Sequence, residues 1–167
     1  MKEYLYAVDD EDNVIEKIEG DIILEKKMLH RNASVIIVNK EGKLYVHQRK
    51  KTKNLYPGMW DVKAGGGVRF GETYEEAALR EMSEEVGINN QKIKFLFSDK
   101  FRSNEFNCNR KVYTVIWDGS ITIQKEEIEQ GRFMDIIEIE NMVDKLSPTE
   151  MQIINKYPEI IKNAKTN

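Results

Sequence analysis

The chain has 167 residues, of which 40% are hydrophobic and 33% charged, and its formal net charge is −3. This balance is typical of a globular protein with a hydrophobic core, and it excludes a disordered or collagen-like composition. Without a basic excess or an apolar run near about 18 residues, the chain is expected to bind neither a nucleic-acid polymer nor a membrane.

The first residues are acidic and carry no apolar signal segment, so we expect residues 1–28 to belong to the fold. The runs EYLYAVD and VIEKIE flank an Asp/Asn-rich turn, which predicts a β-hairpin over residues 4–19. The following DIILEKKML predicts a short helix with Asp21 as its N-cap. This N-terminal extension could cover a pocket or contribute to a homodimer interface.

Two strands are predicted at ASVIIVN and KLYVHQR, on either side of the turn KEGK. The next segment, KKTKNLYPGMWDVKAGGG, is rich in Lys, Gly and Pro, and it is interpreted as a functional loop without regular structure. Arg49 is the best candidate for binding phosphate, because a guanidinium can donate two hydrogen bonds to it. Lys53, Tyr56 and Trp60 are further substrate-binding candidates; a solvated basic surface and core packing of Trp60 are the alternatives.

A helix is predicted to begin at Tyr74, because Thr73 and Glu76 have the spacing of a capping box. Gly87 is expected to end it in a left-handed conformation. Projected at about 100° per residue, the apolar side chains gather on one buried stripe. The stripe contains Ala78, Leu79, Met82 and Val86.

Glu81, Glu84 and Glu85 lie within one arc beside that stripe, near the helix C-terminus, where the macrodipole disfavours negative charge. Two carboxylates about 4 Å apart repel by about 1 kcal/mol in water and by ~4 kcal/mol at a protein surface. A solvated acidic face is one interpretation. A divalent cation would remove the repulsion, and purely carboxylate ligands favour Mg²⁺ or Mn²⁺.

Further strands are predicted at KIKFLFSD, KVYTVIWDG and GRFMDI, and a helix at EIENMVDKL. The last helix, residues 147–167, is expected to begin at Ser147 with a capping box to Glu150. This order predicts an α/β fold, with a mixed β-sheet covered by helices on both faces, in one domain spanning residues 1–167. The lone Cys108 is expected to be unreactive and fits a reducing cytoplasm.

The stretch GGVRFGETYEEAALREMSEEVGI, residues 66–88, resembles the Nudix box G-x5-E-x7-R-E-U-x-E-E-x-G-U, in which U is apolar. Gly66, Glu72 and residues 80–88 match every defined position. A chance match in such a chain is on the order of one in a million. The strand order over residues 31–145 is also similar to the Nudix α/β/α sandwich.

This resemblance implies a metal-dependent attack of water on a diphosphate joined to another group. By position, Glu81 and Glu85 would bind Mg²⁺, with Mn²⁺ as a possible substitute, and Glu84 would share a second ion or its water shell. The backbone carbonyl of Gly65 is the family's usual additional ligand. The implied partner is therefore a small diphosphate substrate.

The same resemblance implies supporting roles for the other defined positions of the box. Glu72 would hold water or the loop, and Arg80 would orient the glutamates through salt bridges. The general base would be Glu81 or an acid in QKEEIEQG, where Glu127 is favoured over Glu126. For the last two, a solvated loop acid is the alternative.

The flanking LHR, QR and PGMW segments resemble isopentenyl-diphosphate isomerases of the same superfamily. The isomerase pattern is incomplete here, because WDVKAGGG has no cysteine and only His30 of two expected histidines is present. His30 and His47 are therefore expected to be packed residues. A hydrolase is favoured over an isomerase, and also over a non-cleaving nucleotide-binding module, since no box carboxylate is missing. Nucleoside phosphates, nucleotide sugars, dinucleotides and non-nucleotide diphosphates remain as substrates.

Overall fold

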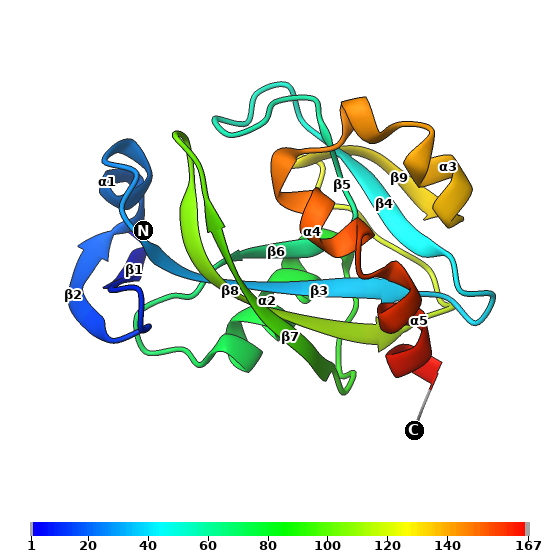
Figure 1. The fold of residues 1–167 in the computed structure, drawn as a ribbon, viewed down its shortest axis with the longest axis horizontal. Helices are drawn as coiled ribbons and strands as arrows, with labels where there is room; N and C mark the ends of the chain where they lie inside the picture. The colour runs from blue at the N-terminus through cyan, green and yellow to red at the C-terminus, as the bar shows by residue number, and fades with distance from the viewer. Residues whose placement is uncertain (1, 166–167) are drawn as a thin grey trace.

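The computed structural model describes residues 2–165 as a mixed α/β fold (Figure 1). The strands are β1 (Tyr4–Val8), β2 (Val14–Glu19), β3 (His30–Val38), β4 (Leu44–Arg49), β5 (Trp60–Asp61), β6 (Ala64–Gly67), β7 (Lys94–Arg102), β8 (Asn107–Ile116) and β9 (Ile128–Met134). The helices are α1 (Gly20–Glu25), α2 (Tyr74–Val86), α3 (Ile136–Glu140), α4 (Met151–Ile154) and α5 (Tyr157–Lys165), with short 3₁₀ turns at Val143–Lys145 and Pro148–Glu150. None of these helices is long and apolar enough to cross a membrane.

Strand β3 is the centre of the sheet, because it pairs with several other strands. It runs antiparallel to β1, β4 and β6 and parallel to β8, which makes the sheet mixed. The hairpin β7–β8 and the strands β4, β5 and β9 extend the sheet on either side. The predicted mixed sheet is therefore confirmed.

Alternate side chains of β3 enter two separate cores, as expected for a strand buried on both faces. Ala33, Val35 and Ile37 pack with the apolar stripe of α2. Ile36 and Val38 pack on the opposite face with Ile153, Ile154 and Ile160 of α4 and α5. Figure 1 shows α4 and α5 in front of the sheet and α2 behind it, which confirms the α/β/α sandwich.

Both predicted ends of α2 are confirmed. The Thr73 hydroxyl accepts from the Glu76 N–H, and the Glu76 carboxylate accepts from the Thr73 N–H, which completes the capping box. Gly87 ends the helix with φ of 71°, in the left-handed region that suits glycine. These local signals fix where the glutamate-bearing helix begins and ends.

The N-terminal unit, defined as β1, β2 and α1, contains the expected hairpin and packs on the sheet through β1. Leu5, Ala7 and Ile23 form a small core of their own beneath it. The helix is shorter than predicted, and its N-cap is Glu19 rather than Asp21, without a side-chain capping bond. Lys27 ends the segment at φ of 54°, which a continuing helix does not allow.

Two other predictions are wrong. The segment over residues 50–67 is not free of regular structure, because it contains β5 and the glycine strand β6. Ser147 and Glu150 form no capping box, and the chain after residue 147 is divided into a 3₁₀ turn, α4 and α5. The Ser147 hydroxyl donates to Asp61 instead, and the Glu150 carboxylate accepts from the Val62 N–H and pairs with Lys63. The predicted end of this helix, at residues 166–167, lies outside the described residues, as does residue 1 of the N-terminal extension.

Candidate active site

The three glutamates near the end of helix α2 differ in their exposure to solvent. The Glu81 side chain is 14% exposed and the Glu84 side chain 43%, whereas Glu85 as a residue is only 7% exposed. Glu81 and Glu85 therefore face inward beside the apolar stripe, and Glu84 lies at the rim. A solvated acidic face does not describe the inner two residues.

Arg80 is the cation that binds most of these acids. Its Nε donates to Glu72 Oε1 at 2.7 Å, and its Nη1 donates to Glu81 Oε1 at 2.5 Å and to Glu84 Oε2 at 3.3 Å. Its Nη2 also donates to the carbonyl of Gly67 at 3.0 Å. Burial alone would lower the pKa of Arg80, but the surrounding carboxylates outweigh it and raise that pKa. Arg80 thus forms salt bridges with Glu72, Glu81 and Glu84 at once.

Glu72 holds the loop before α2. One of its carboxylate oxygens accepts from the backbone N–H of Arg69 at 3.0 Å, and both oxygens accept from Arg80. Burial would raise the pKa of Glu72, yet these hydrogen bonds lower it below its ordinary value. Glu72 is therefore held as a carboxylate between the loop and the helix.

The glycine strand β6 brings backbone against the glutamates. The N–H of Gly65 donates to Glu85 Oε2 at 3.0 Å. The Glu81 carboxylate lies against the α-carbon of Gly66, so a Cβ at this position would overlap it. A side chain on Gly66 would therefore displace the Glu81 carboxylate, whereas a Cβ on Gly65 would overlap the Ala33 carbonyl of the paired strand β3, so Gly65 is needed for the close approach of these strands.

The inner glutamates carry more negative charge than their neighbours compensate. Burial raises the pKa of Glu81, and the attraction of Arg80 does not reverse this. Burial, followed by repulsion from Glu81 and Glu127, raises the pKa of Glu85 well above its ordinary range. Such a cluster favours the approach of a cation.

Glu81, Glu85 and Glu127 line one cavity of about 430 Å³, together with residues 65–67 of β6. All of these offer oxygen atoms, which suit the hard cations Mg²⁺ and Mn²⁺. Within residues 2–165, no three acid, histidine or cysteine side chains converge closely enough to hold an ion as they stand. Arg80 and the Gly65 N–H occupy oxygens of Glu81 and Glu85 instead. The donor set therefore fits a divalent ion in its chemistry, with Arg80 as the competing cation.

The predicted phosphate-binding residues Arg49 and Lys53 line the same cavity. Arg49 donates to Asp61 Oδ2 at 2.7 Å and to the Leu55 carbonyl at 3.1 Å. Lys53 pairs with Glu127 at 2.8 Å. The structure thus brings Arg49, Lys53 and Glu127 together with the box glutamates, whereas Glu126 is exposed.

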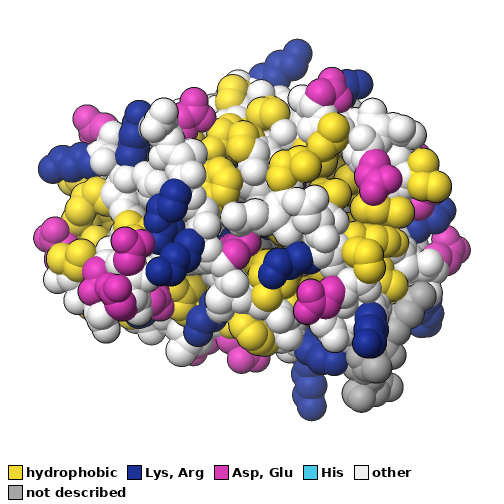
Figure 2. Space-filling view, viewed as in Figure 1, with side chains coloured by type: hydrophobic (Ala, Val, Ile, Leu, Met, Phe, Trp, Pro, Cys, Tyr) yellow, Lys and Arg dark blue, Asp and Glu magenta, His cyan; other side chains and the backbone are white. Residues whose placement is uncertain are grey.

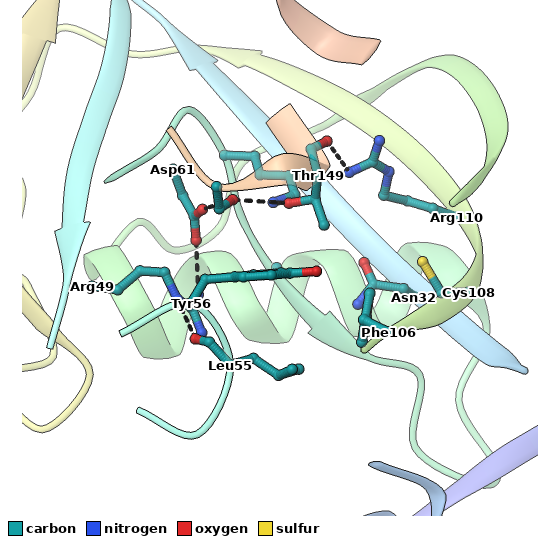
Figure 3. A pocket seen from close by; sticks show the side chains of 12 residues that line it. Asn32, Arg49, Leu55, Tyr56, Asp61, Phe106, Cys108, Arg110 and Thr149 are labelled. Atoms are coloured by element: carbon teal, nitrogen blue, oxygen red, sulfur yellow. Dashed lines mark hydrogen bonds and ion pairs between the residues drawn. The ribbon is translucent and has the colours of Figure 1, made fainter. Parts of the chain in front are cut away.

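Trp60 takes the alternative position. Its side chain packs against the core cluster of α4 and α5, and its carbonyl accepts from the Ser147 N–H at 2.9 Å. The structure thus shows the core packing that was the alternative for Trp60, because neighbouring residues of β5 point to opposite faces and Asp61 lines the cavity. Tyr56 does line a cavity, beside Arg49 and Asp61 (Figure 3).

Part of the lining of that cavity belongs to a buried polar network that the sequence did not indicate. Glu150 is fully buried and accepts from the Val62 N–H at 2.9 Å, from Thr149 at 2.6 Å and from Lys63. Ser147 donates to Asp61, which also accepts from Arg49. Burial would raise the pKa of Asp61, but Lys63 and Arg49 lower it to about 2. These contacts join segments about 90 residues apart, so no local pattern reports them.

The two histidines and the cysteine are buried. Burial lowers the pKa of His47 to about 4, so this ring is neutral at pH 7, and its Nδ1 is the one buried side-chain polar atom without a partner in the described part of the chain. Burial also lowers the pKa of His30, whose Nδ1 lies 3.0 Å from the Met28 carbonyl. Burial raises the pKa of the Cys108 thiol to about 11, which leaves it protonated and unreactive. All three match the packed roles expected for them.

Comparisons with known proteins agree with this geometry. The family model described as NUDIX domain matches residues 28–157. An uncharacterized Nudix hydrolase of Pseudomonas aeruginosa is 32% identical over 136 residues, which cover 79% of this chain and 78% of the relative. A further uncharacterized Nudix hydrolase, from Streptomyces coelicolor, is 32% identical over 83% of this chain and 77% of its own length.

Solved structures share the fold. The crystal structure of DR0079 from Deinococcus radiodurans superposes with a TM-score of 0.76 at 24% identity, covering 98% of this chain and 100% of that one. The NUDIX domain of NrtR from Shewanella oneidensis, solved with ADP ribose, has a TM-score of 0.66 at 17% identity and covers 81% of this chain and 88% of that one. At these identities the likeness concerns the fold alone.

Proposed function

Given that the chain belongs to the Nudix hydrolase family, we propose that it cleaves a diphosphate linkage by attack of water on phosphorus, with Mg²⁺ as cofactor and Mn²⁺ as a substitute. The substrate is a nucleoside diphosphate derivative or a related diphosphate metabolite. The enzyme acts on a small molecule in the cytoplasm, where the unpaired Cys108 remains reduced.

One observation carries this proposal. The inner glutamates of α2 share a cavity with Arg49 and Lys53, so a site for a cation and a site for phosphate lie side by side. Glu81, Glu85 and the Gly65 carbonyl would hold Mg²⁺, and Glu84 at the rim would hold a second ion or its water shell. When bound there, the ion supplies positive charge to the phosphates and polarises the phosphoryl group.

The chain's own residues take the remaining roles. Lys53 and Arg49 hold the phosphate oxygens, for which Arg49 has donors beyond those bound to Asp61 and Leu55. Glu127 accepts the proton of the attacking water, because it lines the cavity whereas Glu126 is exposed; Glu81 is the alternative base. Arg80 and Glu72 keep α2 and the preceding loop in place.

The experiment measures phosphate and pyrophosphate release from a panel of diphosphate compounds, with and without Mg²⁺. We expect Mg²⁺-dependent release by the wild type and a loss of about a thousandfold or more in Glu85→Gln. Glu75→Gln, an exposed glutamate on the first turn of the same helix, is the matched control and should keep full activity. Release that is undiminished in Glu85→Gln, with the fold verified by circular dichroism, would contradict the assignment.

The isomerase alternative is tested separately with isopentenyl diphosphate. The isomerases that the flanking segments resemble carry a pair of glutamates in a later strand, where β8 of this chain has Asn109 and Arg110. Arg110 donates to both carboxylate oxygens of Asp99 and to the Thr149 carbonyl. We expect no isomer of the substrate among the products, whether or not phosphate is released.

A further inference from the structure

The N-terminal unit forms part of the wall of the catalytic cavity. Leu5 of β1 and Asp21 and Leu24 of α1 line the same cavity as Glu81 and Glu85. The contact is direct, since a Cβ placed on Gly67 would lie 2.8 Å from Leu5 Cδ1. The unit therefore belongs to the site, in addition to its place at the edge of the sheet.

A second, outer groove of about 950 Å³ adjoins the catalytic cavity. Four residues line both spaces, which are Asp21, Leu24, Asn54 and Leu55. Helix α1 and the loop after β4 thus both contribute to the boundary that the two spaces share. A group attached to a phosphate in the cavity reaches the groove past these shared residues.

The outer groove differs from the cavity in its chemistry. Its lining includes the apolar side chains of Leu24, Leu55, Tyr56, Pro57, Met59 and Pro148. Figure 2 shows hydrophobic side chains gathered in the upper centre of the molecule, where Figure 1 draws the loop that follows β4.

Charge also distinguishes the two spaces. The charged side chains that line the groove are the carboxylates of Asp21, Glu25 and Glu105 and the amine of Lys27. The cavity is lined by more carboxylates, those of Glu3, Asp21, Glu81, Glu85 and Glu127, but it also has Arg49 and Lys53 as two cationic partners for phosphate. The groove has one cation for three carboxylates, so it disfavours a negatively charged group.

We propose that α1 is a specificity wall, and that the groove beyond it binds an uncharged, partly apolar group joined directly to the diphosphate, with Leu24 as the residue that contacts this group. The inference rests on the proposed function for the position of the diphosphate. Because Leu24 contacts the group in both the bound substrate and the transition state, it sets KM and leaves kcat nearly unchanged.

The test uses non-cleavable methylenediphosphonate esters in the presence of Mg²⁺, with affinity measured by calorimetry. The methyl ester is too short to reach the groove, whereas the hexyl and adenosyl esters extend into it. We expect at least one of the longer esters to bind about tenfold more tightly than the methyl ester. The ester that gains more distinguishes an aliphatic group from a nucleobase.

Leu24→Ser should remove most of that tenfold advantage and leave the affinity for the methyl ester unchanged. Ile22→Ser is the matched control, because Ile22 lies on the same helix and is 38% exposed against 36% for Leu24, but lies outside the lining of both spaces. A hexyl ester that ends in a carboxylate should bind more weakly than the plain hexyl ester.

Any of three results would contradict the proposed role of α1 and Leu24. These are equal affinities for all esters, an unchanged advantage of the longer ester in Leu24→Ser, and a preference for the carboxylate-ended ester. The cleavable diphosphate esters are assayed in parallel. Selective binding without hydrolysis would support the wall and overturn the proposed function. Hydrolysis without selectivity would support the proposed function and contradict the role of α1. The absence of binding by every ester would contradict both proposals.

Discussion

Two groups of buried charges lie close together in this protein, and they are built on opposite principles. In the buried network beside the site, each carboxylate has its own cation: Asp61 has Arg49, Asp99 has Arg110 and Glu150 has Lys63. Around α2, Arg80 is shared by Glu72, Glu81 and Glu84, with Arg69 as a second cation for Glu84 at the rim. Glu85 has no cation as a partner, and its hydrogen bond comes from a backbone N–H.

The difference separates a structural role from a functional one. A balanced buried network satisfies its own charges and fixes the positions of β5, β6 and the chain around residue 150. An unbalanced cluster costs stability in the absence of a cation, and its position at a cavity is what the proposed metal site requires. The same types of side chain thus serve two purposes, and the local charge balance distinguishes them.

The two groups should differ most in stability when one carboxylate of each is neutralised. Glu150→Gln removes one charge from the balanced network and leaves Lys63 buried without its partner, so we expect a loss of about 3 kcal/mol in the free energy of unfolding. Glu85→Gln removes a carboxylate whose charge is opposed by burial, so its stability without metal should be unchanged or higher. Denaturant unfolding in metal-free buffer compares the two variants, and equal losses in both would contradict the distinction.

Within the catalytic cavity, turnover should depend on Glu127 and not on its neighbour Glu126. Glu127→Gln removes the proposed base, and we expect turnover to fall by about a hundredfold or more. Glu126→Gln, its exposed neighbour, should retain wild-type turnover. Steady-state kinetics of the two variants on one diphosphate substrate decide between them, and a reversed order would transfer the role to Glu126.

Buried His47, which lies beside Asp61 of the balanced network, should make stability depend on pH. Burial lowers the pKa of His47 to about 4 in the folded protein, below the value of about 6.5 in an unfolded chain. Protonation of His47 therefore favours the unfolded chain. The free energy of unfolding is unaffected by this residue above about pH 6.5 and decreases as the pH falls toward 4. At pH 5 the decrease caused by His47 is about 2 kcal/mol. Unfolding measured at pH 7 and pH 5 should show a smaller decrease for His47→Gln than for the wild type, and identical decreases would exclude this role.

Local signals predicted part of this fold and site. The ends of α2 follow from Thr73, Glu76 and Gly87, because capping depends on neighbours within one turn. The positions of Glu81 and Glu85 follow from the box in the same way. Strand β6 was missed because glycines have low strand propensity, and only pairing with β3 holds them extended.

Long-range contacts account for the errors. Ser147 and Glu150 have capping-box spacing, yet Asp61 and Lys63, which are far away in sequence, bind their side chains. The sequence also contained no indication that Leu24 lines the cavity and the groove, since this depends on how the N-terminal unit packs against the sheet. Sequence spacing does not report which of several polar or apolar partners a folded chain brings together.

The central claim is that the inner glutamates of α2 bind a divalent cation. It is tested most directly by the free energy of unfolding of the wild type and of Glu85→Gln, measured as the Mg²⁺ concentration is increased. If the claim holds, Mg²⁺ at a hundred times its dissociation constant stabilises the wild type by about 2.7 kcal/mol and leaves Glu85→Gln nearly unchanged. Equal stabilisation of both proteins, or none in the wild type, would contradict it.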